Sequence, residues 1–300
     1  MSQSKSISAS SPDIVRTVDA LRKVLDPIRC SGQRIGVVPT MGALHEGHLS
    51  LMRAALAQGD YVVVTIFVNP TQFAAHEDLG KYPRPMERDT ALCAELGIPV
   101  IFFPSETEIY PPGFQTTVSL SKVTRLWEGA CRPGHFDGVA TVVLKLFQIV
   151  QPDTAYFGAK DYQQQLLIRQ MCRDLNLQVD IRTCPTVREP DGLALSSRNT
   201  YLTSEERASA LSLSRALQLA ADRISAGVSD LAAVRDELHS LLSSTPLVQV
   251  EYATIVDPET LEELNRPRPE MQAIIAARVG STRLIDNARL TTAGGTRLDS

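Results

Sequence analysis

The chain has 300 residues, of which 43% are hydrophobic and 21% are charged. These fractions are those of ordinary globular proteins and exclude a disordered, collagen-like or coiled-coil chain. Thirty basic and 34 acidic residues give a net charge of −4, which argues against a dedicated nucleic-acid-binding protein because such proteins carry a basic surface. A chain of this length has room for about two domains or for one large α/β domain.

The cysteines and the apolar segments indicate the cellular compartment of the protein. Five cysteines form no Cys-x-x-Cys pair, which favours reduced, mostly buried thiols in a cytoplasmic protein. The polar segment 1–12 lacks the apolar stretch of a signal peptide. The longest apolar runs, Tyr61–Val68 and Val139–Val150, are shorter than the roughly 20 residues of a membrane span. We therefore expect a cytoplasmic protein that does not bind a membrane.

Short apolar runs alternate with helical patterns over the first two thirds of the chain. Strands are predicted at Ile35–Pro39, Tyr61–Val68, Val100–Phe103, Ala155–Phe157 and Val179–Val187, with a further strand in Tyr110–Leu120. Helices are predicted at His48–Gln58, Glu87–Leu96, Val139–Val150 and Tyr162–Leu175. This alternation is typical of a parallel sheet covered on both faces.

The pattern changes after Val187. Thr203-Ser-Glu-Glu206 is a capping box, which predicts a long helix through Ile224. A second helix is predicted at Asp230–Leu242, followed by strands at Val248–Val256, Gln272–Val279 and Thr282–Arg289. We therefore expect an α/β protein with a Rossmann-like parallel-sheet domain over residues 1–188 and a smaller α+β domain over residues 189–300. The boundary lies in the turn-rich segment Arg188–Gly192.

The segment Pro39-Thr-Met-Gly-Ala-Leu-His-Glu-Gly-His48 lies between the first predicted strand and its helix. Open α/β sheets bind ligands at this edge, and a helix N-terminus suits phosphate. Gly42 and Gly47 allow close approach of the backbone, and protonated His45 and His48 can donate to phosphate oxygens. Two surface histidines at a helix cap are an alternative. Zinc is disfavoured because the spacing is not His-Glu-x-x-His.

Two later segments also suit phosphate. In Phe157–Gln164, Lys160 can reach a phosphate, and Asp161 can cap the helix or contact a ribose or a metal. A solvated lysine is the alternative. Leu195-Ser-Ser-Arg-Asn199 offers two hydroxyls and a guanidinium, as a phosphate clamp or an ordinary polar linker.

Neutral polar groups follow the strand at Tyr61–Val68, where Asn69 and Gln72 can hydrogen-bond a polar substrate. Arg132-Pro-Gly-His-Phe136 precedes the apolar helix. The P-loop, the Gly-x-Gly-x-x-Gly fingerprint and the Gly-x-Ser-x-Gly elbow are absent from the sequence, which disfavours a P-loop enzyme, an ordinary dinucleotide site and an α/β-hydrolase.

His45-Glu-Gly-His48 resembles the His-x-Gly-His signature of the nucleotidyltransferase superfamily, and Leu195–Asn199 resembles its second loop. The combination is similar to the pantoate–β-alanine ligase (pantothenate synthetase) family, from Ile35 to Asn287. The other matching segments are Pro39–Gly42, Asn69–Phe73, Tyr82–Arg84, Arg132–Phe136, Lys160–Asp161 and Arg283–Asn287. The resemblance implies an ATP-dependent condensation of (R)-pantoate with β-alanine through pantoyl adenylate, with release of AMP and pyrophosphate.

The resemblance also implies a set of site residues. His48, His45 and Lys160 would be catalytic. ATP would be bound by Met41, Gly42, Ala43, Leu44, His45, Glu46, Gly47, His48, Gly158, Ala159, Lys160, Asp161, Val187, Leu195, Ser196, Ser197 and Arg198. Gln72, Gln164 and Asn69 would bind pantoate or β-alanine. Mg²⁺ would accompany ATP, with Asp89 as its contact.

The family further implies a homodimer whose partners are small-molecule substrates. We expect residues 189–300 to act as a lid, because Ser196–Arg198 lie beside the domain junction. The family usually has a glutamate where this chain has Ala159. Two other functions stay open. A nucleotidyltransferase acting on a phosphorylated acceptor would share the histidine motif but would not account for Gln72 and Gln164. A non-catalytic nucleotide sensor would tolerate the loss of His48 or Lys160, and both are present.

Overall fold

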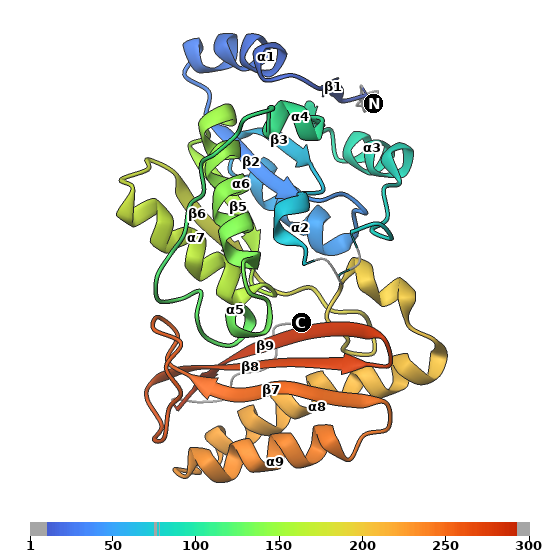
Figure 1. Cartoon of the computed structure of the whole chain (residues 1–300), viewed down its shortest axis with the longest axis vertical. Coiled ribbons are helices and arrows are strands. Elements are labelled where there is room, and N and C mark those ends of the chain that lie inside the picture. Colours follow the sequence, from blue (N-terminus) through green and yellow to red (C-terminus); the bar gives the residue numbers. More distant parts are fainter. Residues whose placement is uncertain (1–10, 75–76, 78, 293–300) are drawn as a thin grey trace, which may run out of the picture. The chain divides into compact units, whose positions relative to one another are not determined.

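The computed structural model describes residues 11–74, 77 and 79–292 (Figure 1). Most of the polar segment 1–12 therefore lies outside the described residues. The chain divides into two compact units. Unit 1 comprises Met1–Ser119, Asp137–Phe157 and Met171–Cys184, and unit 2 comprises Leu120–Phe136, Gly158–Gln170 and Pro185–Ser300. The domain boundary after residue 188 stays a prediction.

Unit 1 contains a six-stranded sheet in the order β1-β4-β3-β2-β5-β6. Its strands are β1 (Asp13–Val15), β2 (Ile35–Thr40), β3 (Tyr61–Ile66), β4 (Val100–Phe102), β5 (Thr154–Gly158) and β6 (Asp180–Cys184). Parallel pairings join β1 to β4, β4 to β3, β3 to β2 and β2 to β5. The predicted Rossmann-like parallel sheet is confirmed.

Helices cover both faces of this sheet. They are α1 (Val18–Cys30), α2 (Glu46–Ala57), α3 (Met86–Glu95), α4 (Glu106–Ile109), α6 (His135–Val150) and α7 (Tyr162–Asp174), the last two being shared between the units. On one face, Met52 of α2 packs in a cluster with Val64 and Tyr156. Phe157 follows Tyr156 and so points to the other face, where its ring lies 6.4 Å from that of Phe147 in α6.

Unit 1 differs from the sequence-based expectation at several points, including the unpredicted strand β1. The predicted strand at Tyr110–Leu120 is wrong, because the backbone there is irregular. Pro111 and Pro112 provide no N–H for a strand ladder, and the Val118 N–H donates instead to the hydroxyl of Thr141 (2.9 Å). Helix α1 was missed. Pro27 lies inside it, and a proline normally argues against a helix interior.

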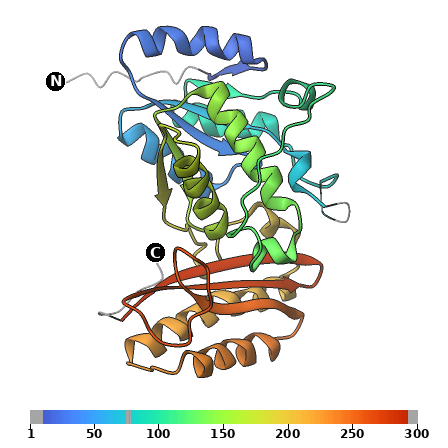
Figure 2. The ribbon, with the colours of Figure 1, turned by 60° about the vertical axis from the view of Figure 1, so that its left-hand side comes forward.

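Unit 2 contains an antiparallel sheet of β7 (Val248–Val256), β8 (Glu270–Val279) and β9 (Thr282–Thr291). Helices α8 (Ser204–Ser225) and α9 (Leu231–Ser243) lie side by side on one face of it (Figures 1 and 2). The capping box is confirmed, since the Glu206 N–H donates to Thr203 Oγ1 (3.2 Å) and Thr203 N–H donates to Glu206 Oε2 (2.9 Å). The expected smaller α+β fold is thus present.

A β-bulge interrupts β7. The register shifts between Val250 and Tyr252, so Glu251 has no partner residue on β8. Val250 and Ala253 both pack in the apolar cluster with α8 and α9. The bulge therefore leaves Glu251 and Tyr252, two consecutive residues, on the face of the sheet away from these helices.

All five cysteines are free thiols, as predicted. The expectation that most are buried is wrong, because only Cys93 and Cys172 are buried, whereas Cys30 and Cys131 are exposed at helix ends. Burial raises the pKa of Cys93 to about 12 and that of Cys172 to about 11. Among the described residues, no helix has the length and apolar character needed to cross a membrane.

Candidate functional site

The loop between β2 and α2 in unit 1 has a specific backbone shape. Gly42 (φ 82°) and Ala43 (φ 51°) are both left-handed, which is costly for an alanine. The carboxylate of Asp89, on α3, accepts the Ala43 N–H at Oδ2 and the Leu44 N–H at Oδ1, each at 2.8 Å. A Cβ at Gly42 would lie 3.1 Å from Asp89 Oδ2. Asp89 therefore holds this loop through its backbone N–H groups, and glycine is needed at position 42 because a side chain there would crowd the carboxylate.

Asp89 is almost completely buried, at 1% exposure. Burial raises the pKa of its carboxyl group, while the hydrogen bonds from Leu44 and Ala43 act in the opposite direction. Within the described residues, no group of three His, Cys, Asp or Glu side chains is placed to hold a metal. The predicted magnesium contact of Asp89 stays a prediction.

His45 and His48 lie at the start of α2. His45 is the N-cap and His48 the third helical residue, and their ring centroids are 4.1 Å apart. The His45 N–H donates to His48 Nδ1 (3.3 Å). Because Nδ1 accepts this bond, the proton of a neutral His48 ring is assigned to Nε2. The pair thus stands at the positive end of a helix, where anions are favoured.

Asn69 and Gln72 form the next part of the candidate site in unit 1. Asn69 is buried, and its Nδ2 donates to Gln72 Oε1 and to the Gly138 carbonyl, both at 3.1 Å. Its Oδ1 accepts the hydroxyl of Tyr110 (2.8 Å). Gln72 Nε2 also contacts Met41 Sδ (3.1 Å). Asn69 therefore positions Gln72, and a direct contact of Asn69 with substrate stays a prediction.

In unit 2, the turn Gly158–Asp161 leads into α7. Lys160 and Ala159 are half-buried, and the Asp161 carbonyl accepts the first helical bond, from Gln165 N–H (3.0 Å). The side-chain nitrogen of Asn287, on β9, donates to the carbonyls of Ala159 (3.0 Å) and Lys160 (2.7 Å). Gln164 is half-buried in the first turn of α7, as predicted.

Two predicted nucleotide-binding residues, Val187 and Leu195, are brought together by a hairpin. Leu195 N–H donates to the Val187 carbonyl (3.0 Å), Arg188 pairs with Ala194, and Gly192 (φ 94°) forms the turn. The turn predicted at Arg188–Gly192 is confirmed, and it brings Val187 and Leu195 next to each other.

The segment after this hairpin carries Ser196, Ser197 and Arg198. Ser196 is the N-cap of the 3₁₀ helix η2 (Ser197–Tyr201), with its Oγ accepting Arg198 N–H (3.3 Å). Asn199 Nδ2 donates to Glu189 Oε1 (2.8 Å) and to the Ala194 carbonyl (3.0 Å). The two hydroxyls and the guanidinium therefore lie in a segment tied back to the hairpin.

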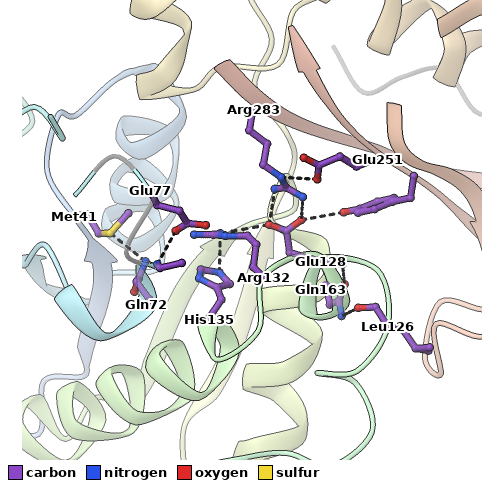
Figure 3. Close-up of polar contacts among 12 residues, drawn as sticks. Met41, Gln72, Glu77, Leu126, Glu128, Arg132, His135, Gln163, Glu251 and Arg283 are labelled. Carbon is purple, nitrogen blue, oxygen red and sulfur yellow. Dashed lines mark hydrogen bonds and ion pairs between the residues drawn. The ribbon is translucent and has the colours of Figure 1, made fainter. Parts of the chain in front are cut away.

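A buried ionic cluster in unit 2 was missed by the sequence analysis (Figure 3). Glu128, on the short helix α5 (Glu128–Cys131), accepts Arg283 Nη1 (2.7 Å) and Nη2 (2.8 Å), together with the Tyr252 hydroxyl (3.1 Å). Arg132 Nη1 lies 3.3 Å from Glu128 Oε1 and 3.1 Å from His135 Nε2. Burial raises the pKa of Glu128, but Arg283, Arg132 and His135 outweigh it and hold that pKa below its ordinary value.

Two features in the sequence pointed toward this cluster. Arg132-Pro-Gly-His-Phe136 and Arg283-Leu-Ile-Asp-Asn287 are both among the segments that carry the family resemblance, and each supplies an arginine to Glu128. Glu128 itself stands in a segment with no recognisable pattern. Gln163, next to the predicted Gln164, was also missed. It is buried and accepts the Glu128 N–H at its Oε1 (3.1 Å).

A parallel sheet with polar loops at the carboxyl ends of its strands defines a ligand-binding α/β protein, and comparison with known proteins identifies the kind. Pantothenate synthetase from Thermus thermophilus has a solved structure that matches with a TM-score of 0.88 at 47% sequence identity, covering 92% of this chain and 98% of that one. Pantoate-beta-alanine ligase from Francisella tularensis, complexed with Beta-gamma ATP and Beta-alanine, matches with a TM-score of 0.77 at 36% identity, covering 93% and 97%.

The sequence comparisons agree. The pantothenate synthetase of Moorella thermoacetica is 52% identical over 278 residues, which are 93% of this chain and 98% of the relative. The model of the pantoate-beta-alanine ligase family matches residues 13–289. The chain therefore belongs to the pantoate–β-alanine ligase family.

Proposed function

We propose that this protein is an ATP-dependent ligase that condenses (R)-pantoate with β-alanine to form pantothenate. One observation carries the proposal: the family match over residues 13–289 includes all the segments that the sequence analysis assigned to the site. In the reaction, the pantoate carboxylate attacks the α-phosphorus of ATP, giving pantoyl adenylate and pyrophosphate. The amine of β-alanine then attacks the activated carbonyl, releasing AMP and leaving pantothenate.

The cationic and hydrogen-bonding groups suit the first step. Attack at the α-phosphorus builds negative charge on its non-bridging oxygens, and preorganised donors stabilise such charge. His45 and His48 stand at the N-terminus of α2, while Lys160 and Arg198 lie in turns held by hydrogen bonds. We assign charge stabilisation to these four side chains and ATP binding to the loops that carry them. The lid role of residues 189–300 stays a prediction.

The glutamines suit pantoate. Pantoate carries two hydroxyl groups, and a glutamine amide both donates and accepts without adding charge beside the carboxylate that must attack. Gln72 is held by Asn69 and Gln164 lies in the first turn of α7. We assign pantoate binding to these two residues, with Asn69 positioning Gln72.

Magnesium fits this chemistry as a companion of ATP. Mg²⁺ usually keeps several waters and takes one or two carboxylates together with substrate phosphates. Asp89 stays the proposed contact: the two backbone N–H groups use about half of the acceptor positions of its carboxylate, which is 1% exposed. When bound, the ion would neutralise phosphate charge.

Exchange of labelled pyrophosphate into ATP tests the proposal directly. With pantoate present and β-alanine absent, the protein should catalyse exchange, because the adenylate forms reversibly. Omission of pantoate should abolish it. A nucleotidyltransferase acting on a phosphorylated acceptor would require that acceptor instead, and a nucleotide sensor would show no exchange at all. Homodimer formation and cytoplasmic location remain predictions, the first of which light scattering would test.

A further inference from the structure

Asn287 is a buried amide on β9 with three polar contacts (8% exposed). Its Nδ2 donates one hydrogen to the Ala159 carbonyl (3.0 Å) and one to the Lys160 carbonyl (2.7 Å). Its Oδ1 accepts the side-chain N–H of Gln272 on β8 (2.8 Å). The amide is therefore locked in one orientation by a strand neighbour and uses both donor positions on a single turn.

The two carbonyls have a particular place in that turn. One belongs to the peptide group before the Cα of Lys160 and the other to the peptide group after it. Holding both peptide planes restricts the two backbone dihedrals of Lys160, and thus the direction in which its side chain leaves the turn. The turn begins at Gly158, where the backbone has few steric limits of its own.

The neighbouring residue anchors a second loop. Asp286 points to the opposite face of β9, where Arg188 Nη1 and Nη2 donate to its carboxylate at 2.7 and 2.9 Å. Arg188 also donates to the Gly192 carbonyl (3.1 Å) within the hairpin that precedes Ser196–Arg198. Two consecutive residues of β9 thus hold the turn that carries Lys160 and the hairpin that precedes Ser196–Arg198.

We infer that Asn287 is a positioning residue that sets the place of the Lys160 side chain for adenylate formation. The inference rests on the proposed function, in which Lys160 stabilises charge on the reacting phosphate. It assigns Asn287 no contact with substrate. The physical basis is that a displacement of about 1 Å in a catalytic group can lower a rate by roughly 10²-fold.

A double-mutant cycle separates this role from simple stabilisation of the fold. Asn287→Asp keeps the shape and the acceptor used by Gln272, and removes the donor to the two carbonyls. We expect it to lower kcat for pantoate-dependent ATP–pyrophosphate exchange by about 10- to 100-fold, with KM for pantoate within about threefold. In a Lys160→Ala background, the same change should cost less than about threefold further. Equal losses in both backgrounds, or no loss in the wild-type background, would overturn the inference.

A second measurement needs no activity. Trypsin cleaves after lysine, and cleavage at Lys160 requires the turn to open. Asn287→Asp and Asn287→Ala should accelerate cleavage at this bond by about tenfold or more in the full-length protein. The control Thr254→Val removes a different part-buried hydrogen bond of the same sheet, from Thr254 on β7 to Glu263 (2.6 Å), and should leave this cleavage and the exchange rate unchanged.

The outcomes are distinguishable. If the wild-type protein shows no exchange, the proposed function is wrong, and the cleavage rate alone still supports or overturns the holding of Lys160 by Asn287. If exchange occurs and neither Asn287 variant changes cleavage at Lys160, the positioning role is wrong and the proposed function stands.

Discussion

Arg283 and Glu128 form a two-point ion pair, in which Nη1 lies 2.7 Å from Oε1 and Nη2 lies 2.8 Å from Oε2. The pair joins β9 to α5 within unit 2, and the exposed fraction of the two side chains is 15% and 8%. Arg283 Nε also donates to Glu251 (2.8 Å), which the bulge of β7 places on the same face. The carboxylates of Glu128 and Glu251 thus both contact the guanidinium of Arg283. This contact fixes the position of α5 and of the Arg132 segment that follows it in the chain.

Removing the charge of Glu128 should destabilise the protein strongly. Breaking a buried ion pair by changing one partner costs about 3–5 kcal/mol, because it leaves the other charge uncompensated. Since Arg283 keeps Glu251 in the Glu128→Gln variant, we expect the lower end of that range, about 3 kcal/mol, in urea unfolding. Glu237→Gln, which breaks the exposed pair with Arg223, is the control and should cost less than about 1 kcal/mol. Similar losses in the two variants would contradict this account.

The same carboxylate should contribute to acid sensitivity. Burial raises the pKa of Glu128, but the cations around it hold that pKa below its ordinary value. A depressed carboxyl pKa adds stability above the unfolded-state pKa of about 4.3, and this stability is lost as pH falls through the folded-state pKa. The stability difference between wild type and Glu128→Gln should be constant above about pH 5 and shrink at lower pH. A difference that grows on acidification would argue against this pairing.

Lys160 and His48 should matter to the chemical step more than to folding. Replacing either with alanine removes one preorganised donor, for which the expected loss in adenylate formation is roughly 10²–10³-fold. Neither side chain is buried, so urea midpoints should stay close to that of the wild type. Single-turnover adenylation in rapid quench would check both. Near-normal adenylation by one variant would remove that residue from the proposed machinery.

Gln72 and Gln164 should affect pantoate and leave ATP alone. Truncation of either leaves a substrate hydroxyl unpaired, which costs about 1–3 kcal/mol. We expect Gln72→Ala and Gln164→Ala to lower kcat/KM for pantoate by roughly 5- to 150-fold. ATP affinity, measured by calorimetry without pantoate, serves as the internal control. An equal loss of ATP affinity would place the glutamine in the nucleotide site.

Thiol labelling should separate the cysteines into two groups. A thiol reacts as its thiolate and only when it is accessible. Burial raises the pKa of Cys93 to about 12 and that of Cys172 to about 11, whereas Cys30 is exposed. At pH 8, mass spectrometry of the folded protein should find maleimide on Cys30 within minutes and almost none on Cys93 or Cys172. Rapid labelling of Cys93 would show that the core around α3 is open.

Local patterns predicted much of this fold. The strand at Val248–Val256 and the capping box at Thr203 are as expected because each depends on neighbouring residues. The strand predicted in Tyr110–Leu120 is absent, because two prolines of the segment provide no N–H donors for a strand ladder. A pattern that depends on several neighbouring residues predicts local structure well, whereas one or two prolines can remove the hydrogen-bond donors that a strand needs.

The candidate site likewise has local features that the sequence predicts and long-range contacts that it does not. The loop at His45 and His48, the turn at Lys160 and the hairpin at Val187 follow from glycines, polar residues and strand ends, which are all local. The contacts that hold them are not local. Asp89 binds the backbone of Leu44 from another helix, and Asn287 binds the carbonyl of Lys160 from the far end of the chain. No spacing rule links such residues, so only the folded chain shows them.

The bulge at Glu251 has a consequence for insertions and deletions in this strand. Val250 pairs with Ala277 and Tyr252 with Ala276, so the two halves of β7 already meet consecutive residues of β8. Deleting Glu251 would therefore join them into a regular strand without turning Val250 or Ala253 away from the helices. The deletion would remove the second carboxylate from Arg283 and the carboxylate that pairs with Arg278 (3.2 Å). One extra residue thus adds a charge to the sheet while preserving the pattern of apolar side chains on either side of it.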